Sequence, residues 1–420
     1  MNRQHSFFGR SLLSVLFCGM VLFGTQIAFA RDFAVKDVKA EIARFNASVA
    51  KENPAPYKTK LTAMKMDAFS FLRGTAHLMV ADIRGTPSLA FLNAAPQGLI
   101  QGDQHVHNFS VLFFPGKSAT YGLDDMDEAH TGPLSWDLFR LCVSLRVGVH
   151  DAEDKDDRSF AVDQMIDGYL EGCSRTGDPD WPGCTMPKFL REFVVNSSKA
   201  GAEGLLKKWA KGIPGQFKRS GEVFPVPPQE FGSLRKALVE FFAAQARSRN
   251  IPKAEVGLLD VVIREGKGLS SIGLRRYFAL LQGENIDGSR ARIIEIKQMR
   301  PSCVGPATLE TQGRDTLAGF AAAHRDRDVF LGTFVLNGKR FLVRELFPWA
   351  ERFEVRDLEK NETPKFAKAL GAISADFHAQ NGKGAAMKAW LEANREGFTK
   401  AVKEYAKQVR EDWKTFSKNK

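Results

Sequence analysis

The stretch that decides the fold reads "GDQHVHNF" and runs from Gly102 to Phe109. An aspartate, two histidines and an asparagine at this spacing can be metal ligands, a catalytic loop or an ordinary polar turn whose side chains bond to backbone amides. The histidines could bind zinc, but the nearby Asp125 and Asp127 are harder oxygen ligands that suit magnesium better. We therefore expect His105 to support a loop by hydrogen bonding.

A second acidic segment, "LDDMDEA", follows a predicted hairpin made of the strand "SVLFF", the turn "PGK" and the strand "ATYGL". The hairpin would bring Asp103, Asn108 and Asp125 back together. Metal-assisted phosphoryl transfer uses such a set: one carboxylate orients the attacking hydroxyl, while an amide oxygen and another carboxylate hold magnesium on the nucleotide phosphates. The two segments together favour this chemistry over a polar turn.

A glycine-rich segment, "GKGLSSIG", lies between two predicted strands and precedes a third strand that bears Lys297. In this arrangement backbone amides and a lysine ammonium can bind phosphates, although no Gly-Lys-Ser/Thr ends the loop at a helix as in a Walker A motif. An ordinary β-turn and a solvated strand lysine are the alternatives. The candidate nucleotide-binding residues of the loop are Gly266, Gly268, Ser270, Ser271 and Gly273.

Lys297 needs an anionic partner to be held near a phosphate. Glu310, on the following predicted helix, could provide it, as the helix glutamate of kinases does. Glu295 lies two residues earlier on the same strand face and is the rival. We favour Glu310, whose alternative is an exposed helix charge.

The remaining chain alternates between helical and β-rich patterns. A helix is predicted over residues 67–83 with Asp67 as its N-cap, and a helical stretch over residues 135–172. Beyond residue 250, strands, the helix "ATLETQGRDTLAGFAAAH" and a hairpin around Asn337 and Gly338 follow, before a helical C-terminal part from about Glu359. A small β-rich lobe is thus expected between helical segments.

"GDQHVHNF" and "LDDMDEAHTGPLSWDLFRL" resemble motifs of a bacterial family known as domain of unknown function 2252. They also resemble the GDxHxxN and IDxxxAxxGDPxxDLA motifs of aminoglycoside phosphotransferases, which have a protein-kinase-like fold. The resemblance runs from "FSFLRG" to "ADFHAQNG", most of the chain. It implies a catalytic loop that includes His105 and roles by position: Asp103 is the catalytic base, Asn108 and Asp125 bind magnesium, and Asp127 is a metal or supporting residue.

The same resemblance implies that Asp137 braces the catalytic loop from a helix, while Arg73, in "FLRG", matches a position whose role the motif does not give. In phosphotransferases the glycine-rich lobe precedes the catalytic loop, whereas here it follows. "AKALGAISADFHAQNG" resembles the helix that normally runs into that loop. Circular permutation explains this order and preserves contacts if the old termini are close in space.

The expected fold class is therefore α+β: a protein-kinase-like two-lobe fold in circularly permuted order. We expect a helical catalytic lobe over residues 31–250, a smaller β-rich nucleotide lobe over 251–350 and completing helices over 351–420. Two departures from the phosphotransferase pattern weaken the prediction of nucleotide binding by this lobe. Ser270 replaces a glycine of the GxGSxG pattern and restricts the backbone there, and Gln298 stands where an acid is expected.

Residues 1–30 have the pattern of a cleavable secretory signal: Arg3 and Arg10, an apolar core and "AFA" at the cleavage positions. The expected mature protein is periplasmic or secreted and has no transmembrane span; a retained anchor is the alternative. An oxidising compartment would favour a disulfide between Cys173 and Cys184, which flank a turn-rich loop. Cys142, in an apolar run, is expected to be a core thiol.

The formal net charge of +11 makes acidic partners more frequent, but solubility alone is the stronger explanation because the lysines are spread over many segments. The basic residues have no spacing typical of a nucleic-acid module. Together these features predict an exported kinase-like phosphotransferase that moves a phosphoryl group from ATP, with Mg²⁺, to an unknown hydroxyl-bearing substrate. The alternatives are AMP transfer on the same fold, or a non-catalytic envelope binding protein. Export favours the last, since ATP is scarce outside the cytoplasm.

Overall fold

The computed structural model describes residues 31–112, 119–148, 155–174, 186–199, 202–210, 215–265, 268–283, 291–324, 328–348, 350–380 and 382–418. The predicted signal, Gly266 and Cys184 lie outside these residues, as does the side chain of Ser270. The predicted Cys173–Cys184 disulfide therefore stays a prediction. The described chain mixes helix and sheet, which confirms the α+β class.

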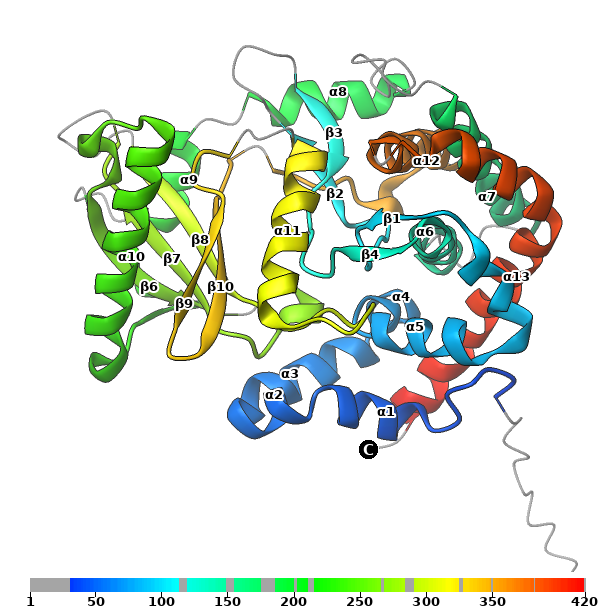
Figure 1. Ribbon diagram of the computed structural model, residues 1–420, viewed down its shortest axis with the longest axis horizontal. Coiled ribbons are helices and arrows are strands. Elements are labelled where there is room, and N and C mark those ends of the chain that lie inside the picture. The colour runs from blue at the N-terminus through cyan, green and yellow to red at the C-terminus, as the bar shows by residue number, and fades with distance from the viewer. Residues whose placement is uncertain are drawn as a thin grey trace, which may run out of the picture.

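Helices from both ends of the chain build the larger part of the molecule, on the right in Figure 1. Their bounds are α1 (Val38–Phe45), α2 (Ala47–Glu52), α3 (Pro54–Lys65), α4 (Ala68–Arg73), α5 (Ala76–Gly85), α6 (Leu134–Gly148), α7 (Lys155–Cys173), α8 (Lys188–Ser197), α12 (Thr363–Ala379) and α13 (Gly384–Lys418). One continuous core of buried side chains joins all of these helices except α2. Cys142 is buried in this core, as expected.

The helix predicted over residues 67–83 is two helices. Asp67 does cap the first, α4, by accepting a hydrogen bond from the amide of Ser70 at 2.6 Å. The chain then leaves the helix at Gly74 and Thr75 and starts again as α5. Thr75 Oγ1 donates to the carbonyl of Phe71, which satisfies a carbonyl at the end of α4. The uninterrupted apolar spacing concealed this break.

The smaller part contains an antiparallel sheet in the order β5-β6-β7-β8-β10-β9. Its strands are β5 (Val223–Pro225), β6 (Leu258–Arg264), β7 (Arg276–Leu281), β8 (Arg292–Gln298), β9 (Gly332–Leu336) and β10 (Lys339–Glu345). Asn337 and Gly338 have φ angles of 51° and 72° and form the predicted hairpin turn. The predicted helix after β8 is α11 (Leu309–His324), which stands between the sheet and the helical part (Figure 1).

The two faces of the sheet have different coverings, because side chains alternate along each strand. Ile294 and Ile296 pack with α10 (Pro228–Arg249) in one apolar cluster. Ile293 on the opposite face packs with Trp209 of α9 (Ala202–Trp209). Lys297 shares that second face. The expected lobe boundary at residue 251 thus falls after β5 and α10, which both pack with the sheet.

Two short strand pairs are nested within the helical part. β2 (Phe109–Leu112) pairs with β3 (Thr120–Leu123), which is the predicted hairpin, and β1 (Gln97–Ile100) pairs with β4 (His130–Pro133). The segments between the inner and outer pairs, residues 101–108 and 124–129, therefore lie side by side. We call them together the acidic double loop.

No helix in the described residues has both the length and the apolar composition needed to cross a membrane.

Candidate functional site

The acidic double loop is closed by backbone and side-chain hydrogen bonds between its two segments. The amide of Asp124 donates to the carbonyl of Asn108 at 3.0 Å, and Gln101 Nε2 donates to the carbonyl of Asp125 at 2.5 Å. Because paired strands flank both segments at each end, the two segments lie beside each other. Asp103 and Asp125 therefore belong to one site, as the sequence predicts.

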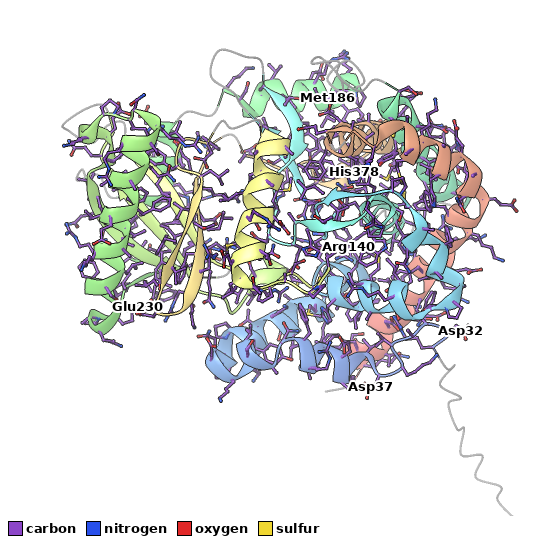
Figure 2. All side chains as sticks on the ribbon, in the orientation of Figure 1. Asp32, Asp37, Arg140, Met186, Glu230 and His378 are labelled. Carbon is purple, nitrogen blue, oxygen red and sulfur yellow. The ribbon has the colours of Figure 1, made fainter. Side chains whose placement is uncertain are left out.

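Asp103 is buried and paired with Arg140, which projects from α6. Arg140 Nε donates to Asp103 Oδ1 at 2.6 Å, and Arg140 also donates to the carbonyl of Leu72 at 2.9 Å. Burial raises the pKa of Asp103 to about 6, and Arg140 opposes the rise. A carboxylate with a pKa near neutrality can accept a proton from a substrate hydroxyl. Figure 2 labels Arg140 on α6.

His105 supports the loop through its backbone and its packing, not through the expected side-chain hydrogen bond. Its carbonyl accepts from the amide of Asn108 at 2.8 Å, and its ring packs edge-on to Phe69 at 6.1 Å. Its Nδ1 is buried with no hydrogen-bond partner in the described part of the chain. Burial and the charge of Arg73 lower the pKa of His105 well below its ordinary value, so the ring is neutral.

Asp137 braces the loop as expected. Its carboxylate accepts from the backbone amides of Gln101 and Gly102, at 2.6 and 2.8 Å. His378 of α12 contacts the same carboxylate at 3.2 Å, and Tyr169 of α7 holds the other ring nitrogen at 2.7 Å. Burial of all these groups makes the chain of contacts costly to break.

The predicted lysine of the sheet reaches the acidic double loop. Lys297 Nζ forms an ion pair with Asp127 and lies 3.9 Å from Asp125 Oδ2. Burial acts to raise the pKa of both carboxyl groups. In Asp125 the positive charges of Lys297 and Arg344 outweigh burial, so the pKa of Asp125 is lowered. In Asp127 burial and the negative charge of Asp125 prevail, so the pKa of Asp127 is raised. One lysine does not neutralise both carboxylates.

Glu310, the favoured partner of Lys297, was predicted wrongly. It is exposed in the first turn of α11, and the ion pairs of Lys297 are made with Asp125 and Asp127. The rival Glu295 is also engaged elsewhere, with Arg276 and Arg344, both at 2.9 Å. Although burial opposes them, these two arginines hold the pKa of Glu295 well below its usual range. Asp125 and Asp127 pair with the lysine, since Glu295 is already held by the two arginines.

The glycine-rich loop rests on the N-terminal helices. Gly268 and Gly273 have φ angles of 76° and 96°, and Asn53 Nδ2 donates to the carbonyl of Gly273 at 2.8 Å. A Cβ on Gly273 would collide with Val49 of α2. Ser271 accepts a hydrogen bond from Arg276 at 3.0 Å, so this candidate phosphate ligand is tied to the sheet.

Two cavities border the glycine-rich loop. One of about 320 Å³ lies toward α3 and β5–β6, with Arg264, Arg275 and Arg276 in its lining. The other, between Ser271 and Asp127, holds about 20 Å³, which is room for a single water molecule. The loop therefore lies close to the acids in this conformation.

Sequence reasoning missed several residues that hold the site. Arg140 lies three residues after Asp137 on the same helix, a spacing that puts both on one face and could have revealed it. Gln312 of α11 donates to the carbonyl of Asp127 at 2.7 Å and accepts from the amide of Ser302 at 3.0 Å. No sequence signal points to Gln312, because its partners are distant in the chain.

The predicted magnesium ligands are oxygen donors of the acidic double loop. Among the described residues, no group of three or more His, Cys, Asp or Glu side chains could hold a metal ion. Magnesium, however, keeps several waters and binds through one or two carboxylates plus substrate phosphates. Asn108 Nδ2 donates to the carbonyl of Asp103 at 2.8 Å, which leaves Oδ1 as an acceptor. Asp125, Asp127 and Asn108 thus fit magnesium bound together with a nucleotide.

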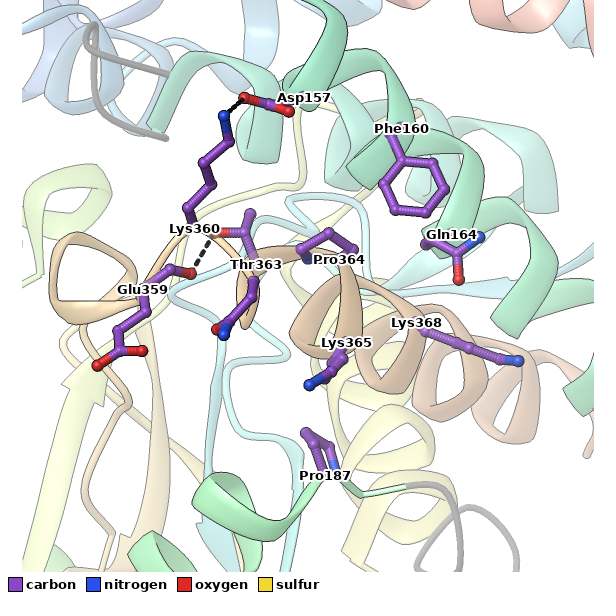
Figure 3. A pocket seen from close by; sticks show the side chains of 11 residues that line it. Asp157, Phe160, Gln164, Pro187, Glu359, Lys360, Thr363, Pro364, Lys365 and Lys368 are labelled. Atoms are coloured by element: carbon purple, nitrogen blue, oxygen red, sulfur yellow. Dashed lines mark hydrogen bonds and ion pairs between the residues drawn. The ribbon is translucent and has the colours of Figure 1, made fainter. Parts of the chain in front are cut away.

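A separate cavity of about 910 Å³ lies between α7, α12 and the start of α8. Figure 3 shows Lys360, Lys365 and Lys368 at its wall, with Lys360 paired to Asp157 at 2.7 Å. It contains no residue of the predicted site. We place the candidate chemistry at the acidic double loop because one of its segments carries Asp103, a buried acid of raised pKa, and the other carries the acids that pair with the sheet lysine.

The model of one protein family, described as uncharacterized protein conserved in bacteria (DUF2252), matches residues 53–419. No curated protein and no solved structure matches the chain. The matched residues include the acidic double loop, the sheet with Lys297 and the helix that carries His378. The chain therefore belongs to the DUF2252 family of bacterial proteins.

Proposed function

We propose that this protein is an exported, magnesium-dependent phosphotransferase that uses ATP, built on a kinase-like two-lobe fold in circularly permuted order. The single observation that carries the proposal is the meeting of Lys297, from the sheet, with Asp125 and Asp127, from the segment that is hydrogen-bonded to the Asp103 loop. Phosphoryl transfer needs this combination of a base, metal-binding carboxylates and a phosphate-binding lysine.

In the proposed reaction, the acceptor hydroxyl oxygen attacks the γ-phosphorus of ATP. The bond to the β–γ bridging oxygen breaks, ADP leaves and Asp103 takes the hydroxyl proton. Arg140 holds Asp103 in position at 2.6 Å, and burial raises the pKa of Asp103 to about 6, close to the working range of a general base.

Asn108, Asp125 and Asp127 would hold magnesium, which neutralises charge on the phosphates when bound. Asp125 and Asp127 share one lysine, and their mutual repulsion favours an additional cation. Lys297 would then move from the carboxylates toward the phosphates. Its present ion pairs keep it extended into the site.

The position of α12 supports the permuted order. Ser374 Oγ donates to Gln104 Oε1 at 2.7 Å, and His378 reaches Asp137. The late helix is thus packed directly on the early loop, as the resemblance to phosphotransferases implies. Gly168 of α7 permits this packing, because a Cβ there would collide with the backbone of Lys368 in α12.

The proposal is tested by incubating the mature chain with Mg²⁺, γ-labelled ATP and a mixture of hydroxyl compounds from the bacterial envelope. We expect labelled product from the native protein and a loss of about a thousandfold in Asp103→Asn and Asp125→Asn. Glu240→Gln, on the exposed side of α10, is the matched control and should retain activity. Unchanged turnover in both site variants would reject the proposal.

The product's mass separates the proposal from its nearest alternative. An added phosphate supports phosphoryl transfer, whereas an added AMP would replace it with nucleotidyl transfer. The absence of any product, together with no affinity for MgATP, would leave a non-catalytic binding protein.

A further inference from the structure

Helix α4 covers the outer side of the Asp103 loop. Phe69 lies edge-on to His107, with ring centroids 4.8 Å apart, and to His105 at 6.1 Å. The carbonyl of Leu72 accepts a hydrogen bond from Arg140, the residue paired with Asp103. Arg73, which follows Leu72, is therefore fixed close to the catalytic loop by its backbone.

Within the described residues, the guanidinium of Arg73 is near Asp103, Glu354 and Asp67 but makes no ion pair with any of them. Its Cζ lies over the Phe69 ring, 5.8 Å from the centroid, and its Nε is buried without a hydrogen-bond partner in the described part of the chain. A buried guanidinium nitrogen left without an acceptor costs free energy. An acceptor brought to the guanidinium by a ligand would offset part of this cost.

A second arginine, Arg352, borders the same loop. Arg352 is 37% exposed, and its Nη2 lies 3.9 Å from Asp124, whose amide donates to Asn108. Arg344 makes the closer contact with Asp124, at 3.1 Å. Asp124 thus pairs closely with Arg344 and only loosely with Arg352. Arg352 can therefore bind another anion.

The two arginines are close enough to influence each other. Burial and then the charge of Arg352 lower the pKa of Arg73, against the opposite effect of Asp103 and Glu354. Glu354 is itself 54% exposed and lies 3.6 Å from His107. Arg73 and the exposed Arg352 therefore both border the loop that carries Asp103, and the nearby Glu354 is turned largely to solvent.

We propose that Arg73 and Arg352 form an anion-binding site for the acceptor, which would carry a carboxylate or phosphate group in addition to its hydroxyl. The role of the hydroxyl rests on the proposed phosphotransfer, whereas the anion site does not. Arginine suits this role because its planar fork donates two parallel hydrogen bonds to a carboxylate or phosphate.

The test is calorimetric titration of the mature chain, without nucleotide or magnesium and at constant ionic strength, with three probes of one carbon skeleton. Glycerol 3-phosphate and glycerate carry the two anions, and glycerol carries none. We expect binding of at least one anionic probe and none of glycerol over the same concentration range. Which anion binds more tightly decides between phosphate and carboxylate.

Variants locate the site. Arg73→Gln and Arg352→Gln should each weaken the anionic probe about tenfold or more, the effect of losing a charge-assisted hydrogen bond. Arg73→Lys should weaken it less, since the charge remains. Arg235→Gln, on exposed α10, should match the native protein. Unchanged thermal unfolding shows that the variants fold.

Two outcomes would overturn the inference: full binding in both Arg73→Gln and Arg352→Gln, or loss of binding only in Lys297→Met, which would place the anion on the nucleotide side. Failure of the phosphotransfer proposal looks different. In that case MgATP would not bind, but the anionic probe would still bind and still depend on Arg73.

Discussion

The acidic double loop and the glycine-rich loop meet at one site but are held in different ways. In the first, side-chain hydrogen bonds fix the backbone: Asp137 accepts from two amides, and Gln312 donates to the carbonyl of Asp127. In the second, packing and two side-chain hydrogen bonds, from Asn53 to the carbonyl of Gly273 and from Ser271 to the carbonyl of Gly268, position the backbone. The difference indicates that the acids form a rigid base and that the glycine-rich loop is the part that adjusts to a ligand.

Removing the brace of the acidic double loop should have the largest effect on stability. Asp137→Ala leaves two buried amides and His378 without their acceptor, so we expect a loss of about 3–5 kcal/mol in the free energy of unfolding. Denaturant titration measures it. The matched change, Asp167→Ala, breaks a half-exposed pair with Arg395 and should cost under about 1 kcal/mol. Equal losses in the two variants would show that Asp137 stabilises the fold no more than a surface ion pair does.

Replacing the buried Lys60 should stabilise the protein. It is 1% exposed in α3 and donates to Asn46 Oδ1 at 2.9 Å. Burial, followed by the charge of Arg300, lowers the pKa of Lys60 to about 7. We expect Lys60→Met to raise the free energy of unfolding by about 1–4 kcal/mol at pH 6.

The pH dependence of this gain has a definite sign. Between pH 7 and 10.5 the unfolded chain keeps the Lys60 proton and the folded chain does not, so the native protein gains stability as pH rises. The advantage of Lys60→Met should therefore be greatest below pH 7 and shrink toward pH 10. Unfolding curves at several pH values check this, with the exposed Lys39→Met as the control. An advantage that grew with pH would contradict it.

The glycine-rich loop should respond to a smaller change in packing. Gly273→Ala adds both backbone strain at φ 96° and a collision with Val49, for which we expect a loss of about 1–3 kcal/mol. Gly221→Ala separates the two causes, since Gly221 has a φ of 63° but open space around a Cβ. Equal losses in the two variants would show that contact with α2 contributes nothing.

The smallest effect expected is a change in hydrogen exchange on nucleotide binding. The cavity of about 20 Å³ between Ser271 and Asp127 cannot admit phosphates without movement of the loop. MgATP should thus alter amide exchange in residues 268–274 and leave residues 101–108 nearly unchanged. A larger change in the second segment would reverse the assignment of the rigid and adjustable parts.

The sequence predicted best what depends on local pattern. The hairpin after the Asp103 loop, the turn at Asn337 and the helix after the lysine strand all follow from short-range periodicity and turn residues. Nested strand pairing then places Asp125 beside the Asp103 loop, which a hairpin also implies. These features are confirmed because each depends on residues that are close in the chain.

The sequence predicted poorly what depends on competition between distant partners. The sequence offered Lys297 two possible partners, Glu310 on the helix and Glu295 on the strand. In the structure Glu295 forms ion pairs with Arg276 and Arg344, and Lys297 forms one with Asp127. The break at Gly74 likewise depends on packing, since Met64 and Leu269 leave no room for a Cβ there. Neither result follows from local periodicity, because both depend on contacts between residues that are distant in the chain.

The central claim is that Lys297 and Asp125 act on the same nucleotide. Calorimetric titration of MgATP into the native mature chain, Lys297→Met, Asp125→Asn and the double variant tests it. We predict binding by the native protein, losses of about tenfold or more in each single variant, and a double loss clearly smaller than the sum of the two. Undetectable binding by the native protein, or strictly additive losses, would contradict the claim.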